Sequence, residues 1–240
     1  PPHTPPPTHP PSRPHPLPIT ASPLHLIRKS RLTFPFITLE GGHGVGQTTH
    51  VLSLFQTIKN KYPGIMTREP GGYDLVKTIK QILINTHNKI NFATEALLYA
   101  ADRIEHLQQV IKPALSDNKI VICDRYLDSS FVYQGYVRKL GIKFIKQINY
   151  LAYNLLPDIT FYLDLEPKQI LKRLYVRNKS KLEGFDTQKL FWHQQIRKGY
   201  LRLCRRYPKR IIKINTNNLS VKEVHLIILE KLRELFGLNI

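Results

Sequence analysis

A run of nine residues, Gly41–Thr49 (GGHGVGQTT), separates a short apolar segment from a segment with helical periodicity. The apolar segment is 36–39 (FITL), and apolar residues then recur at helical spacing from Val51 to Ile58. Glycines let the backbone curl so that its amides point inward at an anion, and the start of the following helix adds positive potential. This order of strand, loop and helix predicts a phosphate-binding cradle.

The loop fits the phosphate-binding pattern G-x-x-x-x-G-K-[ST] at every fixed position except one. Gln47 stands where the pattern has a lysine, whose ammonium neutralises charge on the β- and γ-phosphates. Glutamine is neutral, so binding can survive on backbone amides while catalysis is weakened unless another group compensates. Thr48 is expected to supply a hydroxyl to Mg²⁺. The residues assigned to the nucleotide are Gly41, Gly42, His43, Gly44, Val45, Gly46, Gln47 and Thr48.

Apolar, β-branched runs alternate with longer segments of helical periodicity along the chain. The predicted strands are 36–39, 64–67, 119–123, 159–164 and 210–214, and the later predicted helices are 73–86, 93–116, 142–154, 167–177, 187–206 and 221–236. Strands separated by helices of this length imply βαβ crossovers. We therefore expect an α/β fold of the P-loop NTPase type, a parallel five-stranded sheet with helices on both faces, over residues 34–240.

The first 33 residues differ in composition from the rest of the chain. They contain eleven of the eighteen prolines and no carboxylate, which predicts a disordered leader at 1–33. The two cysteines exclude a disulfide scaffold, and no apolar run is long enough for a membrane helix. We expect a cytoplasmic protein without a membrane partner; import into an organelle by the leader is the alternative.

Three motifs that follow the loop carry a resemblance to a known family. They are Thr67–Gly72 (TREPGG), Leu97–Arg103 (LLYAADR) and Asp124–Ser130 (DRYLDSS), the last closing with Tyr133–Gly135 (YQG). Together with the loop they resemble, in spacing and order, thymidylate kinase, the P-loop enzyme that phosphorylates dTMP with ATP. The resemblance covers about residues 34–236 and implies ATP as donor, dTMP as acceptor and Mg²⁺ as cofactor. The joint TREPGG and YQG motifs disfavour a different nucleotide kinase.

Two arginines and one aspartate follow predicted strands. Arg68 and Arg125 would face the crevice at the carboxyl ends of the strands, where guanidinium groups can clamp a monophosphate; surface ion pairs are the alternative. Asp124 ends an apolar run, as a carboxylate that orients Mg²⁺ does, and helix capping is a compatible role. The candidate catalytic residues are Gln47, Arg125 and Asp124, and the candidate Mg²⁺ ligands are Thr48 and Asp124, the latter directly or through water.

The remaining acceptor residues follow from the resemblance. Tyr99 and Arg103 share one helix face, and the resemblance implies that the ring stacks on thymine and the arginine hydrogen-bonds a base carbonyl. Tyr133 and Gln134 resemble the residues that flank deoxyribose and base, and a ring against C2′ would exclude a ribose hydroxyl. The predicted dTMP-binding residues are Arg68, Tyr99, Arg103, Arg125, Tyr133 and Gln134. The resemblance also implies a cis bond between Glu69 and Pro70.

The chain departs from the family pattern at three places. Besides Gln47, His43 stands where most thymidylate kinases carry an acidic residue, and the predicted short lid at 177–186 has Lys181 and Leu182 where the bacterial-type pattern has an Asp-Arg pair. A nearby lysine or Arg177 can substitute as a cation, although a lysine lacks the guanidinium fork. We therefore expect phosphoryl transfer from ATP to dTMP, giving dTDP and ADP. The alternative is a nucleotide-binding protein that is catalytically weak or inactive.

The chain is strongly basic, with 36 Lys and Arg against 17 Asp and Glu, a net charge of +19. Residues 168–213 contain fifteen Lys and Arg and two acids, a net of +13. This excess is consistent with an electrostatic funnel for nucleotides, a nucleic-acid surface or a solvated basic face. Because no nucleic-acid-binding motif is present, nucleic acid is not expected as a partner. Thymidylate kinases are commonly dimers, so a homodimer is a further expectation from the resemblance.

Overall fold

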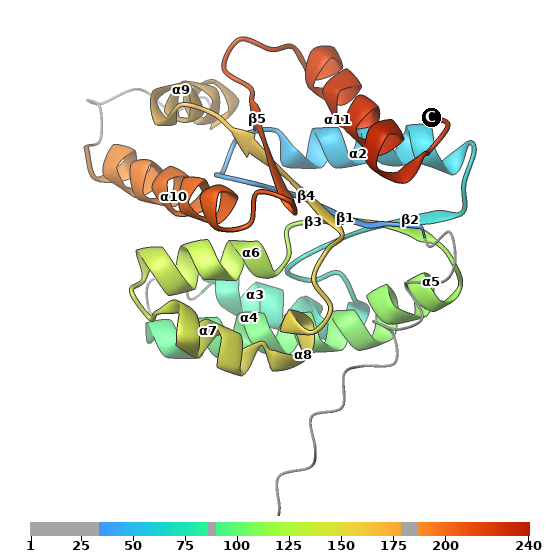
Figure 1. Ribbon diagram of the computed structural model, residues 1–240. Coiled ribbons are helices and arrows are strands. Elements are labelled where there is room, and N and C mark those ends of the chain that lie inside the picture. Colours follow the sequence, from blue (N-terminus) through green and yellow to red (C-terminus); the bar gives the residue numbers. More distant parts are fainter. Residues whose placement is uncertain (1–33, 86–89, 179–186) are drawn as a thin grey trace, which may run out of the picture. The chain divides into compact units, whose positions relative to one another are not determined.

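The computed structural model describes residues 34–85, 90–178 and 187–240. The predicted leader at 1–33 and residues 179–186 of the predicted lid lie outside the described residues, so both segments stay predictions. Within the described ranges the chain forms a five-stranded parallel sheet with helices on both faces (Figure 1). The predicted fold class is confirmed.

The five strands are β1 (Phe36–Gly41), β2 (Gly64–Arg68), β3 (Ile120–Asp124), β4 (Ile159–Asp164) and β5 (Ile211–Asn215). They lie in the order β2-β3-β1-β4-β5, and each neighbouring pair is parallel. Every strand starts within one residue of its predicted start. The central strands β1 and β4 are buried along their whole length, as expected when helices cover both faces of a sheet.

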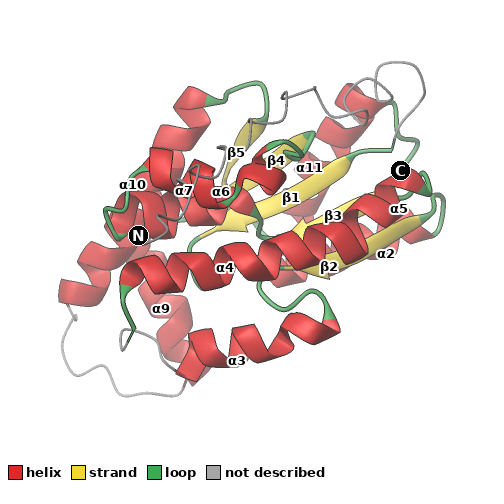
Figure 2. Cartoon of the chain, turned by 90° about the horizontal axis from the view of Figure 1, so that it is seen from below, coloured by secondary structure: helices red, strands yellow, loops and turns green. Residues whose placement is uncertain are grey.

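The helices are α2 (Gln47–Lys59), α3 (Lys77–Asn85), α4 (Phe92–His106), α5 (Lys112–Ser116), α6 (Leu127–Ser130), α7 (Ile142–Ile148), α8 (Tyr150–Tyr153), α9 (Pro167–Asn178), α10 (Thr187–Arg206) and α11 (Val221–Phe236). Figure 1 shows α2 and α11 on one face of the sheet and α4 and α10 on the other. Figure 2 shows α3 lying beside α4.

Two hydrophobic clusters, one on each face, form the core. Successive residues of a strand point to opposite faces, so Leu39 packs with Leu54 of α2 and Ile228 of α11, whereas Phe36 packs in the cluster that contains Ile196 of α10. This two-sided core fixes the strand ends, at which the loops that carry the site begin.

The segment Leu127–Val137, which was not predicted as a helix, is helical in the structure: α6 leads into a π-helical segment, Phe131–Val137 (FVYQGYV). Its β-branched and aromatic residues and its glycine have low helix propensity. Packing against α10 overrides that propensity, because Gly199 of α10 lies so close that an added Cβ would come within 2.9 Å of Val132. The predicted helix 142–154 is divided into α7 and α8 at Asn149, which is buried.

Candidate active site

The carboxyl ends of β2, β3 and β1 bring the predicted motifs together. Arg68 of β2 is in register with Asp124 of β3, and Asp124 is in register with Leu39 of β1. Just beyond Leu39, β1 enters the glycine-rich loop. The edge of the sheet at which the three strands end is the usual place for a ligand crevice in such folds.

The glycine-rich loop adopts a conformation that favours glycine at two positions. Gly44 and Gly46 have φ values of 81° and 92°, in the left-handed region. Val45 between them is buried in the core, and Gly46 caps the start of α2. The loop is therefore anchored by one apolar side chain while the amides at the start of α2 remain available to an anion.

Thr48 and Asp124, the two predicted Mg²⁺ ligands, are in contact. The Thr48 hydroxyl donates a hydrogen bond of 2.7 Å to Asp124 Oδ2 in an exposed position. A hydroxyl and a carboxylate are the hard oxygen ligands that Mg²⁺ uses together with phosphate oxygens and water. Within 34–85, 90–178 and 187–240, no cluster of three or more His, Cys, Asp and Glu side chains is placed to hold a metal ion. The pair thus fits a Mg²⁺ site that a bound nucleotide would complete.

Gln47 and Arg125, both predicted as catalytic, are also in contact. Gln47 is buried, its Nε2 donates to the Leu39 carbonyl at 3.2 Å, and its Oε1 accepts a hydrogen bond of 2.6 Å from Arg125 Nη2. Arg125 has a left-handed backbone with φ of 69°. Its Nη1 donates to the hydroxyl of Ser129 at 3.2 Å, and its guanidinium lies over the ring of Tyr133.

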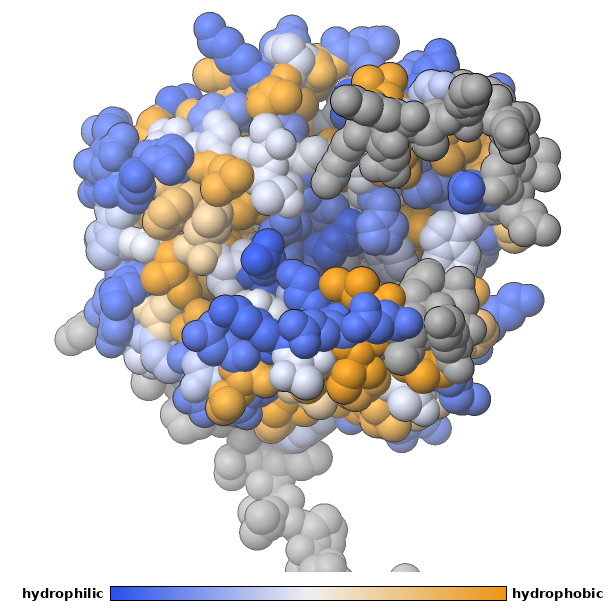
Figure 3. Space-filling model, turned by 180° about the vertical axis from the view of Figure 1, so that it is seen from behind, coloured by the Kyte–Doolittle hydropathy of each residue, from blue (hydrophilic) through white to orange (hydrophobic). Residues whose placement is uncertain are grey.

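A pocket of about 660 Å³ lies beside the loop. It is lined by His43, Glu69, Pro70, Lys80, Leu83, Ile84, Glu95, Tyr99, Arg103, Arg125, Tyr126, Ser129, Ser130, Tyr133, Gln134, Arg138, Leu174, Trp192 and His193. Five of the six predicted dTMP-binding residues are among them. The sixth, Arg68, is exposed at the end of β2 and is not part of the lining. Figure 3 shows a hollow lined mainly by hydrophilic residues.

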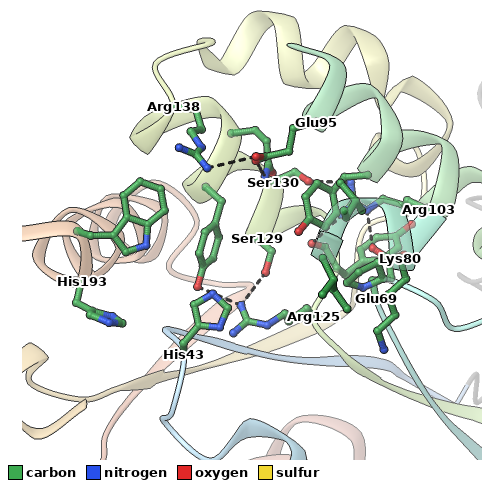
Figure 4. A pocket seen from close by; sticks show the side chains of 18 of the residues that line it. His43, Glu69, Lys80, Glu95, Arg103, Arg125, Ser129, Ser130, Arg138 and His193 are labelled. Atoms are coloured by element: carbon green, nitrogen blue, oxygen red, sulfur yellow. Dashed lines mark hydrogen bonds and ion pairs between the residues drawn. The ribbon is translucent and has the colours of Figure 1, made fainter. Parts of the chain in front are cut away.

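Figure 4 shows how the labelled side chains divide the pocket. His43 and Arg125 lie together on one side, and Glu69, Arg103 and Lys80 lie on another. The ring of His43 is 5.7 Å from that of Tyr133, measured between centroids, in an edge-to-face arrangement. His43 is therefore a residue of the loop that also lines the pocket.

Arg103 is the most deeply buried of the predicted acceptor residues, with 2% of the residue exposed. Its Nε donates to Glu69 Oε2 at 2.7 Å, and its Nη1 donates to Asn149 Oδ1 at 2.7 Å and to the Ser130 hydroxyl at 3.0 Å. The bond before Pro70 is cis, as the resemblance implied. The guanidinium is thus held by protein groups at the base of the pocket, and its contact with a nucleobase stays a prediction.

Gln134 is held by an acid that sequence reasoning missed. The Gln134 amide nitrogen donates to Glu95 Oε1 at 3.0 Å, and Arg138 Nη2 lies 3.3 Å from Glu95 Oε2. This orientation leaves the Gln134 carbonyl oxygen as the group that can accept a hydrogen bond from a ligand. Tyr99 lies nearby, and burial, with a smaller effect of Glu95, raises its pKa to about 12, which keeps the phenol neutral.

Glu40, the last residue before the loop's first glycine, was also missed. Its carboxylate accepts hydrogen bonds from the Tyr126 amide at 2.8 Å, the Ser129 hydroxyl at 2.6 Å and the Tyr200 hydroxyl at 2.7 Å. Burial, and next the charge of Asp128, raise the pKa of Glu40 to about 7. The sequence did contain a signal for this residue, because Glu40 is the first acidic residue of the chain and directly follows the predicted strand 36–39.

Lys80 of α3 is a further cation of the pocket that sequence reasoning missed. Burial and the neighbouring charge of Arg68 lower its pKa, while Asp102 and Asp124 act in the opposite direction. Its ammonium is therefore close to the strand ends where Arg68 and Asp124 lie. A single lysine on an amphipathic helix gives no signal that separates it from a solvated residue.

The basic segment 168–213 contains some cations with structural roles. Arg197 pairs with Asp164 at 2.8 Å and Arg210 pairs with Asp128 at 2.6 Å. Arg205, Lys209 and Lys213 line an open groove of about 950 Å³ beside β5, away from the pocket described above. None of the helices that the structure describes is both long and apolar enough to cross a membrane.

Comparisons with known proteins identify a family model and relatives that this chain resembles. The family model for thymidylate kinase matches residues 39–228. The chain is 47% identical over 207 residues to a thymidylate kinase of Aster yellows witches'-broom phytoplasma (strain AYWB), covering 85% of this chain and all of that protein. It is 41% identical to a thymidylate kinase of Acholeplasma laidlawii over 82% of this chain and 98% of that protein. A crystal structure of thymidylate kinase from Ehrlichia chaffeensis superposes with a TM-score of 0.68 at 30% identity, covering 84% of this chain and 99% of that chain.

Proposed function

This chain belongs to the thymidylate kinase family, whose members phosphorylate dTMP, and we propose that it transfers the γ-phosphoryl group of ATP to the 5′-phosphate of dTMP. The products are dTDP and ADP, on the route to dTTP. The observation that carries the proposal is the position of Arg125, which contacts Gln47 of the glycine-rich loop and also lines the pocket. A donor site and an acceptor site therefore meet at one guanidinium.

The glycine-rich loop is the proposed donor site. Its amides and the start of α2 hold the phosphates of ATP, and the contact between Thr48 and Asp124 supports a Mg²⁺ ion at this position. Thr48 and Asp124 would hold this Mg²⁺, which would supply positive charge against the phosphates of the nucleotide. Thr48 and Asp124 orient each other before any ligand binds, which lowers the cost of assembling the site.

The pocket is the proposed acceptor site. Tyr99 offers a ring to thymine, and the carbonyl oxygen of Gln134 is oriented to accept the N3–H of the base. Tyr133 presents its ring to the sugar, and Arg125 binds the 5′-phosphate through a planar fork. Arg68 and Lys80 add positive charge at the same edge of the sheet. Catalysis then consists mainly of positioning and charge neutralisation around an in-line transfer.

The second candidate function is a nucleotide-binding protein with weak or no turnover, and Gln47 is the observation that favours it. A neutral side chain replaces the lysine that neutralises transferring phosphate in related P-loop enzymes. The acceptor residues favour an enzyme, whereas this donor residue favours a binding protein. Homodimer formation and a cytoplasmic location remain predictions.

A coupled ADP-release assay with dTMP, ATP and Mg²⁺ tests the proposal. We expect dTMP-dependent ADP release by the wild type that Gln47→Lys does not increase substantially. Dependence on the base is checked with dCMP and dGMP, which we expect to be poor acceptors. ADP release near background in the wild type, with a large gain in Gln47→Lys, would support the binding protein instead.

A further inference from the structure

The side chain of Gln47 is hydrogen-bonded at both ends, although the residue replaces a lysine in the loop pattern. Its Nε2 donates to the carbonyl of Leu39, at 3.2 Å, and its Oε1 accepts from Arg125 Nη2 at 2.6 Å. Only 7% of the residue is exposed. Gln47 therefore joins the end of β1 to the first residue after β3, and it does so within the protein interior.

The contacts of Arg125 leave part of its guanidinium open to the pocket. Nη2 meets Gln47, while Nη1 meets the hydroxyls of Ser129 at 3.2 Å and Tyr133 at 3.5 Å. These hydrogen bonds to described residues come from Nη1 and Nη2. Since Arg125 also lines the pocket, its guanidinium can meet a phosphate bound there. Figure 4 shows Arg125 near His43 and joined to Ser129 by a hydrogen bond.

A lysine could not make the contact that Gln47 makes. An ammonium group only donates hydrogen bonds, whereas the amide oxygen of glutamine accepts one. Arginine stays protonated at any ordinary pH, so a lysine at position 47 would place a second cation against the guanidinium in the unliganded protein. The exchange of lysine for glutamine therefore removes a charge but adds an acceptor for Arg125.

We propose that Gln47 is a positioning residue that fixes Arg125 at the junction of the loop and the pocket, so that the charge on the transferring phosphoryl group is neutralised by Arg125 rather than by residue 47. This inference rests on the proposed function, since it assigns Arg125 to the 5′-phosphate of the acceptor, the group to which the phosphoryl group is transferred. It differs from a view of Gln47 as a degenerate lysine in one respect. If Gln47 positions Arg125, its substitution should weaken the binding of dTMP. If Gln47 is only the remnant of a lost lysine, its substitution should affect the binding of ATP.

Isothermal titration with dTMP, and separately with a non-hydrolysable ATP analogue, distinguishes the two views. Gln47→Met keeps the size of the side chain and removes the acceptor. Since a hydrogen bond to a charged group is stronger than one between neutral groups, we expect the Kd for dTMP to rise about tenfold or more, with the Kd for the analogue changing less than about twofold. We expect Gln47→Lys to weaken dTMP binding too, although it adds a positive charge.

Gln108→Met is the matched control, because the Gln108 side chain also accepts a hydrogen bond from a cation, Lys112, and lies outside the pocket lining. We expect no change in either Kd for this variant. If Gln47→Met fails to fold, as judged by circular dichroism, Gln47→Asn replaces it, because an amide that is one methylene shorter cannot reach Arg125. An unchanged Kd for dTMP together with weakened binding of the analogue would overturn the proposal.

A nitrogen-15 NMR measurement on the free protein separates this inference from the proposed function. The Arg125 guanidinium signals, assigned with Arg125→Lys, should show slow rotation of the Nη2 group in the wild type and faster rotation in Gln47→Met. Equally fast rotation in both proteins overturns the positioning role, whatever the activity. Slow rotation together with absent dTMP binding would instead overturn the proposed function.

Discussion

Arg103 of α4 and Glu69, the residue after β2, form an ion pair of 2.7 Å in which 2% and 3% of the two side chains are exposed. The second oxygen of Glu69 lies 3.1 Å from His106 Nδ1. Arg103 Nη1 donates to Ser130 and Asn149, and Nη2 donates to the Tyr126 carbonyl at 3.4 Å. Every side-chain nitrogen of Arg103 and both carboxylate oxygens of Glu69 therefore have partners within the protein. Such networks are rigid when complete and costly when one partner is removed.

Glu69→Gln tests this network. The substitution keeps the shape of the side chain but leaves the buried Arg103 charge without its counterion, so we expect the free energy of unfolding to fall by about 3 kcal/mol. Urea denaturation measures it. Asp74→Asn is the control, since it breaks the exposed pair with Lys77 and should change stability by about 0.5 kcal/mol or less. Equal effects of the two variants would contradict a structural role for the buried pair.

Glu95→Gln tests how the base is recognised. Glu95 accepts hydrogen bonds from Gln134 and Arg138 with its two oxygens, and a glutamine can accept with only one. Because the Gln134 amide then loses its fixed orientation, we expect KM for dTMP to rise about tenfold and the preference for dTMP over dCMP to narrow by a similar factor. Glu230→Gln on the exposed side of α11 serves as control. A KM unchanged by Glu95→Gln speaks against Gln134 as a base contact.

Tyr133→Leu tests discrimination against ribonucleotides. The Tyr133 ring forms an edge-to-face pair with His43 and lines the pocket, where we propose that it excludes a 2′-hydroxyl. We expect the ratio of kcat/KM for dUMP to that for UMP to fall about tenfold in Tyr133→Leu, since the two acceptors differ only at C2′. Tyr133→Phe keeps the ring and should keep the ratio. The same ratio in all three proteins would mean that another group excludes the hydroxyl.

Glu40 makes stability depend on pH. Its pKa in the folded protein is raised from 4.5 to about 7, so between these values the folded protein holds a proton that the unfolded chain has released. The stabilisation that the protonated Glu40 carboxyl contributes is fully present below pH 4.5 and is lost as the pH rises to about 7. Relative to Glu40→Gln, we expect the wild type to lose about 3 kcal/mol of unfolding free energy between pH 4.5 and 7. A pH-independent difference would contradict the raised pKa.

The sheet could be predicted because each strand is a short run of apolar, β-branched residues, and a segment with helical periodicity separates it from the next strand. The helix at 127–137 could not, since its residues favour strands in isolation and become helical only through contact with α10. Local sequence patterns report propensity and periodicity, whereas that helix depends on packing between residues distant in the chain.

In the candidate site, too, some residues could be predicted from the sequence and others could not. The sequence indicates the loop residues, Asp124 and Arg125, because they come directly after predicted strands. It indicates Tyr99 and Arg103 because both belong to the LLYAADR motif. Glu95 and Lys80 have no such signal, because a polar residue on an amphipathic helix has the same pattern whether it faces solvent or a pocket. The contact between Gln47 and Arg125 joins residues 78 positions apart, and no spacing rule indicates it.

Single-turnover transfer from radiolabelled ATP tests the central claim most directly. Excess enzyme is mixed with [γ-³²P]ATP, Mg²⁺ and dTMP, and the acid-quenched products are separated. We expect the label to appear in dTDP, and the rate to fall at least about a hundredfold in Arg125→Ala, because the guanidinium that spans the loop and the pocket is lost. Bound dTMP with no label in dTDP would contradict the account and identify the chain as a nucleotide-binding protein.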